Sequence, residues 1–326
     1  MSYALTVESF DSLASYRANP NDRLKWSSIF VLPTWLKVWW QVFGPGAELY
    51  LRALRQSDEI IGFAPLMMGK ETARFIGSDD VCDYLDFVVT PGMERVFFDV
   101  VLDDLKAKGI NHLDLGPLRP DSTVLTDLVG TAQNRGYDVF CRPEDVSLEV
   151  DLPHTWEEYL ATLDKKQRHE VRRKLRRLWE AGNVEHHCFQ LSQEVEDYMG
   201  TFLKLFSVSR DEKARFMTAR MESFFRSIAK AMAEAGLLRF GVIELDAHIM
   251  AMTIGFDYDD SHYLYNSAYD PQFDYLSVGL LCKVLCLKES IEKGKKKWDF
   301  LKGDEKYKYQ LGGREVPLYK CHITIK

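Results

Sequence analysis

Apolar and polar residues alternate in short runs through much of the first half of the chain, which is typical of half-buried β-strands. Polar turns near residues 57 and 69 separate three such runs between residues 48 and 77. The period changes to that of a helix in residues 93–109, where Gly109 fits a C-terminal cap. The predicted order is three strands in 48–77, a strand in 84–90, a helix in 93–109 and a strand in 111–118.

The second half of the chain repeats this order of elements. The segments Gly109–Asp114 and Gly294–Asp299 place a helix-ending glycine and a strand aspartate at the same spacing. Two matches in the same order predict a duplicated α/β unit, and we place the two copies in residues 1–150 and 151–326. The elements predicted for the second copy are three strands in 237–269, a helix in 277–294 and a strand in 296–303.

A basic helical segment lies between the two copies. Thr155 and Glu158 form a capping box, and apolar residues then recur at helical spacing, so residues 155–181 are predicted as one helix or two in series. Eight Lys and Arg residues fall within residues 165–177. They can form a solvated face, a nucleic-acid surface, or a local anion site. For the anion site we select Arg168 and Arg172, which share one helix face.

The overall charge argues against a nucleic-acid role for most of the surface. The chain has 326 residues and a formal net charge of −7. Residues 1–150 hold 14 basic and 22 acidic residues, so the basic side chains concentrate in the second half. We therefore expect no binding to duplex nucleic acid. No signal peptide and no transmembrane segment is expected from the sequence, which favours a cytoplasmic protein.

The six cysteines show no CxxC pairing, and a reduced protein is expected. Cys282 and Cys286 lie four residues apart on an apolar helix and are predicted to pack in the core. His186-His187-Cys188 lacks a second ligand cluster at zinc spacing, so no metal site is expected there.

The helix in the second copy begins with small residues. Backbone N–H groups at such a start can hold a phosphate, which makes the first residues candidates for binding a phosphorylated ligand. Gly279 costs helix stability and needs a reason: it either permits close helix–sheet packing or lets the backbone approach a pyrophosphate. Ser277 is also a natural N-cap. The candidate binding residues are Ser277, Val278, Gly279 and Leu280.

Two neighbouring segments carry groups suited to proton transfer. The strand before this helix ends in Tyr265, Asn266, Tyr269 and Asp270, which form either a simple turn or a cleft that orients a nucleophile. The segment 298–313 is either a charged surface loop or a source of a carboxylate base, a lysine and tyrosines. Its candidate residues are Glu305, Tyr307 and Lys308.

Several strings together resemble the GNAT superfamily of acyltransferases, and most of all its CelD/BcsL-type group, which is associated with cellulose and exopolysaccharide biosynthesis. These strings are GFAPL, CDYLDFVV, TWEEYL, RHEVRRKLRRL, YNSAYDPQF and DFLKGDEKYKYQLGG. The chain is also distantly similar to Fem-type aminoacyl transferases. The resemblance implies an α/β (α+β) fold of tandem GNAT-like units, each with a mixed, mostly antiparallel sheet flanked by helices.

The resemblance also implies an activity: transfer of an acyl group from acetyl-CoA or another acyl-CoA to an amine or hydroxyl of a sugar or polysaccharide precursor. Asp270 or Glu305 would accept the proton, Lys308 would stabilise the oxyanion, and Tyr269 or Tyr307 would protonate the leaving thiolate. The lysine of the Fem-type F-K-x-x-F-G string falls on Lys308. No permanently bound cofactor is expected.

The same resemblance leaves two alternatives open. The GNAT loop pattern R/Q-x-x-G-x-G/A meets Asp274, Ser277 and Gly279 here, and Fem-type enzymes with poor loops use aminoacyl-tRNA. One alternative is therefore a tRNA-dependent transferase, and the other is a non-catalytic scaffold in polysaccharide biosynthesis. The first copy lacks a glycine-rich helix start, so its Asp83 and Tyr84 are predicted to line the acceptor cleft, together with Arg168.

Overall fold

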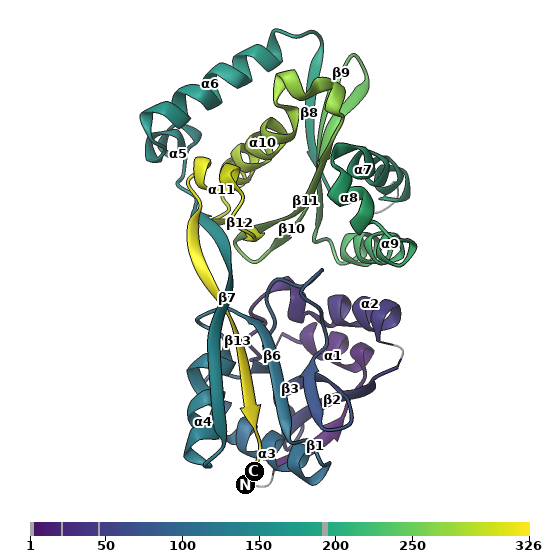
Figure 1. Cartoon of the computed structure of the whole chain (residues 1–326), viewed down its shortest axis with the longest axis vertical. Coiled ribbons are helices and arrows are strands. Elements are labelled where there is room, and N and C mark those ends of the chain that lie inside the picture. The colour runs from purple at the N-terminus through teal and green to yellow at the C-terminus, as the bar shows by residue number, and fades with distance from the viewer. Residues whose placement is uncertain (1–2, 21, 45, 191–194) are drawn as a thin grey trace. The chain divides into compact units, whose positions relative to one another are not determined.

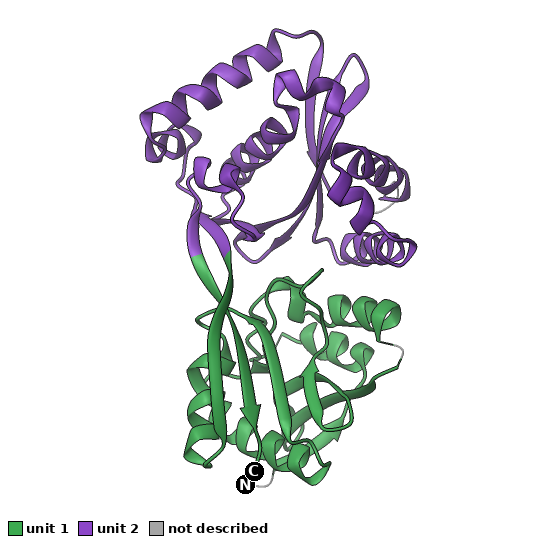
Figure 2. Ribbon diagram, viewed as in Figure 1, with its two compact units in different colours: residues 1–146, 316–326 green, residues 147–315 purple. Residues whose placement is uncertain are grey.

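The computed structural model describes residues 3–20, 22–44, 46–190 and 195–326. The chain divides into two compact units, residues 1–146 with 316–326 and residues 147–315 (Figure 2). Each unit contains one run of the sheet with helices beside it (Figure 1). Within the described residues, no helix has both the length and the apolar character needed to cross a bilayer.

Unit 1 is built on the first six strands of the sheet, closed by the last strand of the chain. Its strand order is β1-β2-β3-β4-β6-β13, all antiparallel except the β4–β6 pair, and β5 pairs with β3. Its strands are β1 (Tyr3–Val7), β2 (Glu48–Gln56), β3 (Glu59–Met68), β4 (Thr72–Phe75), β5 (Val88–Val89), β6 (His112–Leu118), most of β13 (Arg314–Thr324) and, beside β13, the first part of β7 (Asp138–Asp151). Its helices are α1 (Phe10–Arg17), η1 (Ile29–Val31), α2 (Pro33–Phe43), α3 (Glu94–Ala107), η2 (Val124–Leu128) and α4 (Val129–Asn134).

Unit 2 repeats this topology. Its order is β8-β9-β10-β11-β12-β7, again antiparallel except for one parallel pair, β11–β12. Its strands are β8 (Val184–Phe189), β9 (Leu238–Leu245), β10 (His248–Tyr258), β11 (Ser261–Tyr269), β12 (Lys297–Lys302) and the end of β7 (Asp138–Asp151). Its helices are α5 (Trp156–Thr162), α6 (Lys165–Trp179), α7 (Val195–Ser209), α8 (Asp211–Phe216), α9 (Ala219–Glu234), η3 (Pro271–Leu276), α10 (Val278–Glu292) and α11 (Lys306–Gln310).

The predicted repeat of three strands, a helix and a further strand is present in both units, and both place the helix between the two strands of the parallel pair; β5 occurs only in unit 1 among the described strands. The predicted fold class, a mixed and mostly antiparallel sheet flanked by helices, is also confirmed. The strand expected in residues 84–90 is reduced to Val88–Val89.

The closing strand of each unit comes from the other half of the chain. β7 follows the helices of unit 1 yet pairs with β12, and β13 follows unit 2 yet pairs with β6. The predicted boundary therefore differs from the observed one in residues 316–326, which belong with unit 1. Alternation of apolar and polar residues identifies a strand but does not say which strand it pairs with.

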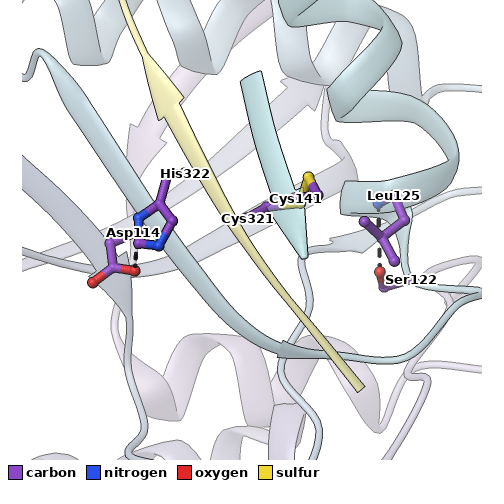
Figure 3. Close-up of a disulfide and its surroundings, with 6 residues drawn as sticks. All are labelled: Asp114, Ser122, Leu125, Cys141, Cys321 and His322. Atoms are coloured by element: carbon purple, nitrogen blue, oxygen red, sulfur yellow. Dashed lines mark hydrogen bonds and ion pairs between the residues drawn. A yellow bond between two sulfur atoms is a disulfide. The ribbon is translucent and has the colours of Figure 1, made fainter. Parts of the chain in front are cut away.

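A disulfide joins Cys141 of β7 to Cys321 of β13, which are 180 residues apart in sequence (Figure 3). The sequence-based expectation of a reduced chain is wrong for this pair. The two strands are neighbours in the sheet, and this brings the cysteines together. Figure 3 also shows the ion pair between His322 of β13 and Asp114, its partner residue on β6.

The crossover helix of unit 2 is buried on nearly every side. α10 packs against β8, β9, β10 and β11 on one face of the sheet, and it also contacts α5 and α6. α7 and α9 cover the opposite face (Figure 1). A helix enclosed in this way needs apolar residues all round, which explains the sequence VGLLCKVLCL and makes its single charged residue, Lys283, conspicuous.

Candidate functional site

The two parallel strands of unit 2 separate next to the start of α10. β11 has nine residues, but only Ser261–Tyr263 pair with β12. A β-bulge interrupts the β10–β11 pairing, where Ile254 faces Asn266 and the next residue, Gly255, faces Leu264. Bulges re-aim strands and often occur beside active sites. The pairing of β11 with β12 therefore ends at Tyr263, and the rest of β11 leads through η3 to α10.

The start of α10 offers unpaired backbone donors. Ser277 adopts a left-handed conformation with φ of 59°, and its side chain makes no capping hydrogen bond. Its carbonyl accepts from the N–H groups of Leu280 and Leu281. Within the described residues, the N–H groups of Val278 and Gly279 have no acceptor. This is the arrangement in which a helix start can bind an anion.

Gly279 lies against an aromatic ring. A Cβ at this position would stand 2.9 Å from Cδ1 of Tyr269. Contacts of this length require the ring to shift, so close packing is one reason for the glycine. The two reasons predicted for this residue are compatible, since the packed face points to Tyr269 and the backbone N–H is unpaired.

Lys283 is buried one turn further along α10. Its side chain is 7% exposed, and its Nζ donates a hydrogen bond of 2.7 Å to the carbonyl oxygen of Gly279. The Nζ also lies 4.9 Å from the centroid of the Tyr307 ring. Burial lowers the pKa of Lys283 to about 8. An ammonium group with only one carbonyl partner among the described residues can bind or release a proton near neutral pH.

Lys213 of α8 is a second cation close to Lys283. Burial first, and then the charges of Lys283 and Arg210, lower the pKa of Lys213 to about 7. Its Nζ donates to the carbonyl oxygen of Ser267, in the part of β11 beyond its pairing with β12, and lies 4.6 Å from the centroid of the Phe206 ring. We call Arg210, Lys213 and Lys283 the cationic cluster. Because three positive groups influence one another here, an anionic ligand would be stabilised and would raise these pKa values.

The loop after β12 brings one carboxylate toward the cationic cluster. Glu305 raises the pKa of both lysines of the cluster, opposing the effect of burial. Lys308 holds this loop: its buried Nζ donates to the carbonyl oxygens of Leu301, Lys302 and Gly303 and forms a 2.8 Å ion pair with Glu305. The three N–H bonds of Lys308 are thus engaged, which favours a positioning role over the predicted oxyanion role.

The loop after β12 has an uncommon backbone conformation. Leu301 is fully buried and has a φ of 62°, in the left-handed region that a leucine rarely adopts. Its N–H donates to Oδ1 of Asp299. A buried residue in such a conformation persists only when its surroundings hold it there, and it is common at functional sites. Tyr307, which follows this loop, is kept protonated at neutral pH because burial raises its pKa.

The end of β11 is mostly engaged in local structure. Asp270 caps η3 by accepting from the N–H of Gln272, and its other oxygen lies 3.2 Å from Nε2 of His248. Oδ1 of Asn266 accepts from the next N–H in the chain. The ring of Tyr265 packs between Phe225 and Phe256. Asp270, Asn266 and Tyr265 thus have structural roles, which leaves Tyr269 as the fourth residue predicted at this strand end.

The two selected arginines of α6 differ. Arg172 pairs with Glu157 of α5 at 2.5 Å, and both side chains are exposed. Arg168 is half-buried and makes no ion pair or side-chain hydrogen bond in the part of the chain that the structure describes. α6 contacts η3 and α10, so Arg168 belongs to an element beside the helix start. Of the two, Arg168 is the one whose charge is available to a ligand.

The residues selected in unit 1 lie in the segment between β4 and β5. Tyr84 is buried, and its ring contacts Phe30 and lies 5.0 Å from the guanidinium carbon of Arg119. Asp83 is half-buried. Their assignment to an acceptor cleft stays a prediction.

Sequence reasoning missed the two lysines of the cationic cluster. Lys283 had a signal, because one lysine within the apolar run VGLLCKVLCL must have a partner or a function. Lys213 sits in the polar string SRDEKARF, where nothing distinguishes it from surface lysines. Its burial depends on how α8 packs, which the sequence pattern does not state.

Comparison with known families places this region in a recognised type of domain. Residues 165–309 match the family model described as an acetyltransferase (GNAT) domain. This segment includes α6, the cationic cluster and the loop held by Lys308. A comparison with curated proteins found no match.

Solved structures share the fold of the whole chain. A crystal structure of FemX superimposes with a TM-score of 0.66 and 13% identity, covering 98% of this chain and 96% of that one. A conserved protein of unknown function from Bacteroides thetaiotaomicron gives 0.62 and 11% identity, with coverage of 99% and 100%. L-PGS from Bacillus licheniformis gives 0.53 and 12%, with coverage of 89% and 90%.

At these identities the structural comparisons establish the fold alone, while the narrower CelD/BcsL-type resemblance stays a prediction. The cationic cluster and the open start of α10 thus lie within a segment, residues 165–309, that matches the acetyltransferase domain of the GNAT type.

Proposed function

We propose that the protein transfers an acyl group from an acyl-CoA to an amine or hydroxyl acceptor, with a sugar or polysaccharide precursor as the acceptor class. One observation carries the proposal: β11 leaves β12 after three residue pairs, next to a helix start with two unpaired N–H groups and the buried Lys283. The match of residues 165–309 to a GNAT acetyltransferase domain supports it.

The donor would bind along β11 and α10. The N–H groups of Val278 and Gly279 would donate hydrogen bonds to an oxygen of the pyrophosphate, with Ser277 and Leu280 flanking them. The pantetheine arm would run along the part of β11 that extends beyond its pairing with β12. The acidic residues Asp270 and Asp274 before the helix would oppose a diphosphate, and the cationic cluster would offset that repulsion.

The chemical step would be direct attack in a ternary complex. The acceptor nitrogen or oxygen bonds to the thioester carbon, the carbon–sulfur bond breaks, the acceptor proton passes to a base, and the thiolate takes a proton from an acid. Lys213, with its pKa of about 7, and Glu305 are our candidates for the base. Tyr269 is the first candidate acid and Tyr307 the second, because burial raises the pKa of Tyr307 and makes it the weaker proton donor. A well-placed acid or base contributes on the order of 10²–10⁴-fold.

The acceptor would be recognised by side chains that the donor does not use. Arg168 is the candidate in unit 2, and Asp83 and Tyr84 are the candidates in unit 1. Arg172 has a weaker case, because Glu157 already pairs with it. Lys308 would act by positioning Glu305, and Asp270 by capping η3.

A second candidate function follows from α6. Its eight basic residues and half-buried, unpaired Arg168 fit a Fem-like transferase that takes its acyl group from aminoacyl-tRNA. Binding of tRNA would then weaken steeply with salt, because each neutralised phosphate releases counterions. The third alternative, a non-catalytic scaffold, predicts no turnover with either donor.

An assay of CoA release separates these functions. Full-length protein is incubated with acetyl-CoA or longer acyl-CoAs and a panel of amino sugars and sugar nucleotides, and free thiol is measured. We expect acceptor-dependent thiol release that the Lys213→Met variant slows by about 100-fold. The matched control is Lys288→Met, an exposed lysine of α10. Acyl transfer from aminoacyl-tRNA without any thiol release would support the second function. No transfer from acyl-CoA or from aminoacyl-tRNA would favour the scaffold.

A further inference from the structure

Three metal-binding side chains meet at the edge of unit 2, away from the start of α10. Nε2 of His186 lies 3.6 Å from Sγ of Cys188 and 3.8 Å from Sγ of Cys286. The two sulfur atoms are 3.0 Å apart, although the cysteines are separated by 98 residues in sequence. Their ligand atoms all lie within 4.8 Å of one another.

The fold explains why these groups converge. His186 and Cys188 are two residues apart on β8, so their side chains leave the same face of the strand. α10 packs on β8 and carries Cys286. The sequence-based rejection of a metal site counted only neighbours in the chain, and it assigned Cys286 to core packing. Cys286 is indeed buried, but it is buried against two other ligands.

A glycine makes room for the sulfur atoms. Gly241 of β9 pairs with Cys188, and a Cβ on Gly241 would stand 2.1 Å from Sγ of Cys286 and 3.5 Å from Sγ of Cys188. Gly241 has no left-handed backbone conformation that would require glycine. The physical reason for glycine here is therefore the space taken by Sγ of Cys286 together with Oγ1 of Thr253, which would stand 2.5 Å from the added Cβ.

The spacing fits one metal better than others. Zinc binds thiolates at about 2.3 Å and imidazole at about 2.0–2.1 Å in a tetrahedron, whose sulfur–nitrogen edges are then about 3.6 Å and sulfur–sulfur edges about 3.8 Å. Both sulfur–nitrogen distances here already match. The sulfur–sulfur distance of 3.0 Å would have to open by about 0.8 Å. Two thiolates and an imidazole also favour a soft or borderline ion over magnesium or calcium.

A fourth ligand position is available from the solvent side. A cavity of about 420 Å³ is lined by His186 and Glu289, and a smaller one of about 10 Å³ is lined by both cysteines and Glu289. The carboxylate of Glu289 is ion-paired with Lys293 one turn along α10. Either water or Glu289 would complete four-coordination, and the larger cavity gives an ion a path to His186.

We propose that His186, Cys188 and Cys286 bind one zinc ion, which ties the edge strand β8 to the crossover helix α10. The site would be structural. β8 is the outermost strand of unit 2 and pairs only with β9 in the described sheet, so a metal link to α10 would protect that edge. The proposal is independent of the acyltransferase function, since none of the three ligands belongs to the cationic cluster or the start of α10.

The test uses the full-length chain and measures metal content directly. Protein produced with zinc in the medium is dialysed, and zinc is counted by elemental analysis; we expect about one ion per chain. Cys286→Ser and Cys188→Ser should each reduce this at least tenfold. The matched control is Cys82→Ser, a buried free cysteine of unit 1, and this variant should keep its zinc.

A second measurement guards against variants that fail to fold. Metal-free wild-type protein is titrated with Co²⁺, and tetrahedral thiolate coordination should give a sulfur-to-cobalt charge-transfer band that zinc displaces. His186→Ala should weaken binding by at least tenfold while the circular dichroism spectrum stays unchanged. Gly241→Ala should also weaken it, since its Cβ would displace Sγ of Cys286.

Three results would overturn the zinc site. Folded wild-type protein that holds no zinc and binds Zn²⁺ more weakly than micromolar would do so. So would equal zinc loss in Cys82→Ser and Cys286→Ser. The third is a Cys188–Cys286 disulfide in freshly purified protein, detected as a linked peptide by mass spectrometry without reductant, because it would show the pair to be a redox pair.

Discussion

The crossover helices α3 and α10 occupy the same place in the two units, and only one of them begins a candidate ligand site. Each lies in the chain between the two strands of its unit's parallel pair, and in unit 1 the short β5 also precedes the helix. α3 begins with Glu94 in its first turn, whereas α10 has no acidic residue there. A carboxylate at a helix start interacts favourably with the helix dipole and repels a second anion. In unit 1, Glu94 therefore stabilises the start of α3 and disfavours the binding of an anion there.

The first strands of the two parallel pairs differ in a related way. β4 ends one residue after its three pairs with β6, whereas β11 continues for six residues after its three pairs with β12. Lys213 donates to the carbonyl oxygen of Ser267 in this extension of β11. The two units thus share their strand pairing. The residues at the end of β11 and at the start of α10 decide which unit can bind a ligand.

The largest effect is expected from removing the buried lysine that holds the loop after β12. Lys308→Met would leave three carbonyl oxygens without their donor and would uncouple Glu305. We expect the free energy of unfolding to fall by about 3 kcal/mol, measured by chemical denaturation. Glu305→Gln should cost less than about 1 kcal/mol because that side chain is 54% exposed. Equal losses in both variants would contradict the positioning role of Lys308.

A transplanted charge tests the helix-start comparison itself. Leu280→Glu puts an acidic residue in the first turn of α10, as Glu94 does in α3. We expect acyl-CoA binding to weaken about tenfold, while the melting temperature stays the same or rises, since glutamate suits this position of a helix. Leu280→Gln is the neutral control. If both variants weaken binding equally, shape rather than charge governs the start of α10.

The depressed pKa of Lys213 predicts a pH dependence of stability. Its pKa is about 7 in the folded protein against an ordinary value near 10.5, so the folded state binds fewer protons than the unfolded state between these values. The cost of burying the ammonium is thus present below pH 7 and fades as the pH rises toward 10. Lys213→Met should be more stable than the wild type at pH 6.5, and this advantage should shrink by pH 9.5. A difference independent of pH would mean that Lys213 is not buried as a charge.

The smallest effect is expected in unit 1. Glu94→Gln removes the acid from the first turn of α3. However, β4 ends one residue after its pairs with β6, and α3 has no buried lysine. We expect no gain of acyl-CoA binding, and a loss of stability of about 0.5 kcal/mol from the weakened dipole interaction. A second binding event in Glu94→Gln would show that charge alone separates the two units.

The sequence predicted the elements of the fold better than their partners. Polar turns and the helix-ending Gly109 and Gly294 determine local backbone, so strand and helix order followed from them. The exchange of β7 and β13 did not follow, because the alternating pattern leaves pairing open. The Cys141–Cys321 bond and the meeting of Cys286 with Cys188 depend on such pairing and packing across 180 and 98 residues.

The candidate site was predicted in part. The start of α10 was found because small residues after a strand have a local meaning. The predicted role of Lys308 missed its carbonyl partners, which belong to a loop turned by the left-handed Leu301. Asp270 was read as a base, but its spacing to Gln272 also fits a cap, and in the structure it caps. Burial, which decides whether a charged residue is a surface group or a functional one, is set by tertiary packing.

Calorimetric titration of the full-length protein with acyl-CoA tests the central claim, that the start of α10 alone binds the donor. The account predicts a stoichiometry of about one per chain and a 10- to 100-fold loss of affinity in Lys283→Met, with Lys288→Met unchanged. A stoichiometry of two, an unaffected Lys283→Met, or no heat with any acyl-CoA would contradict it.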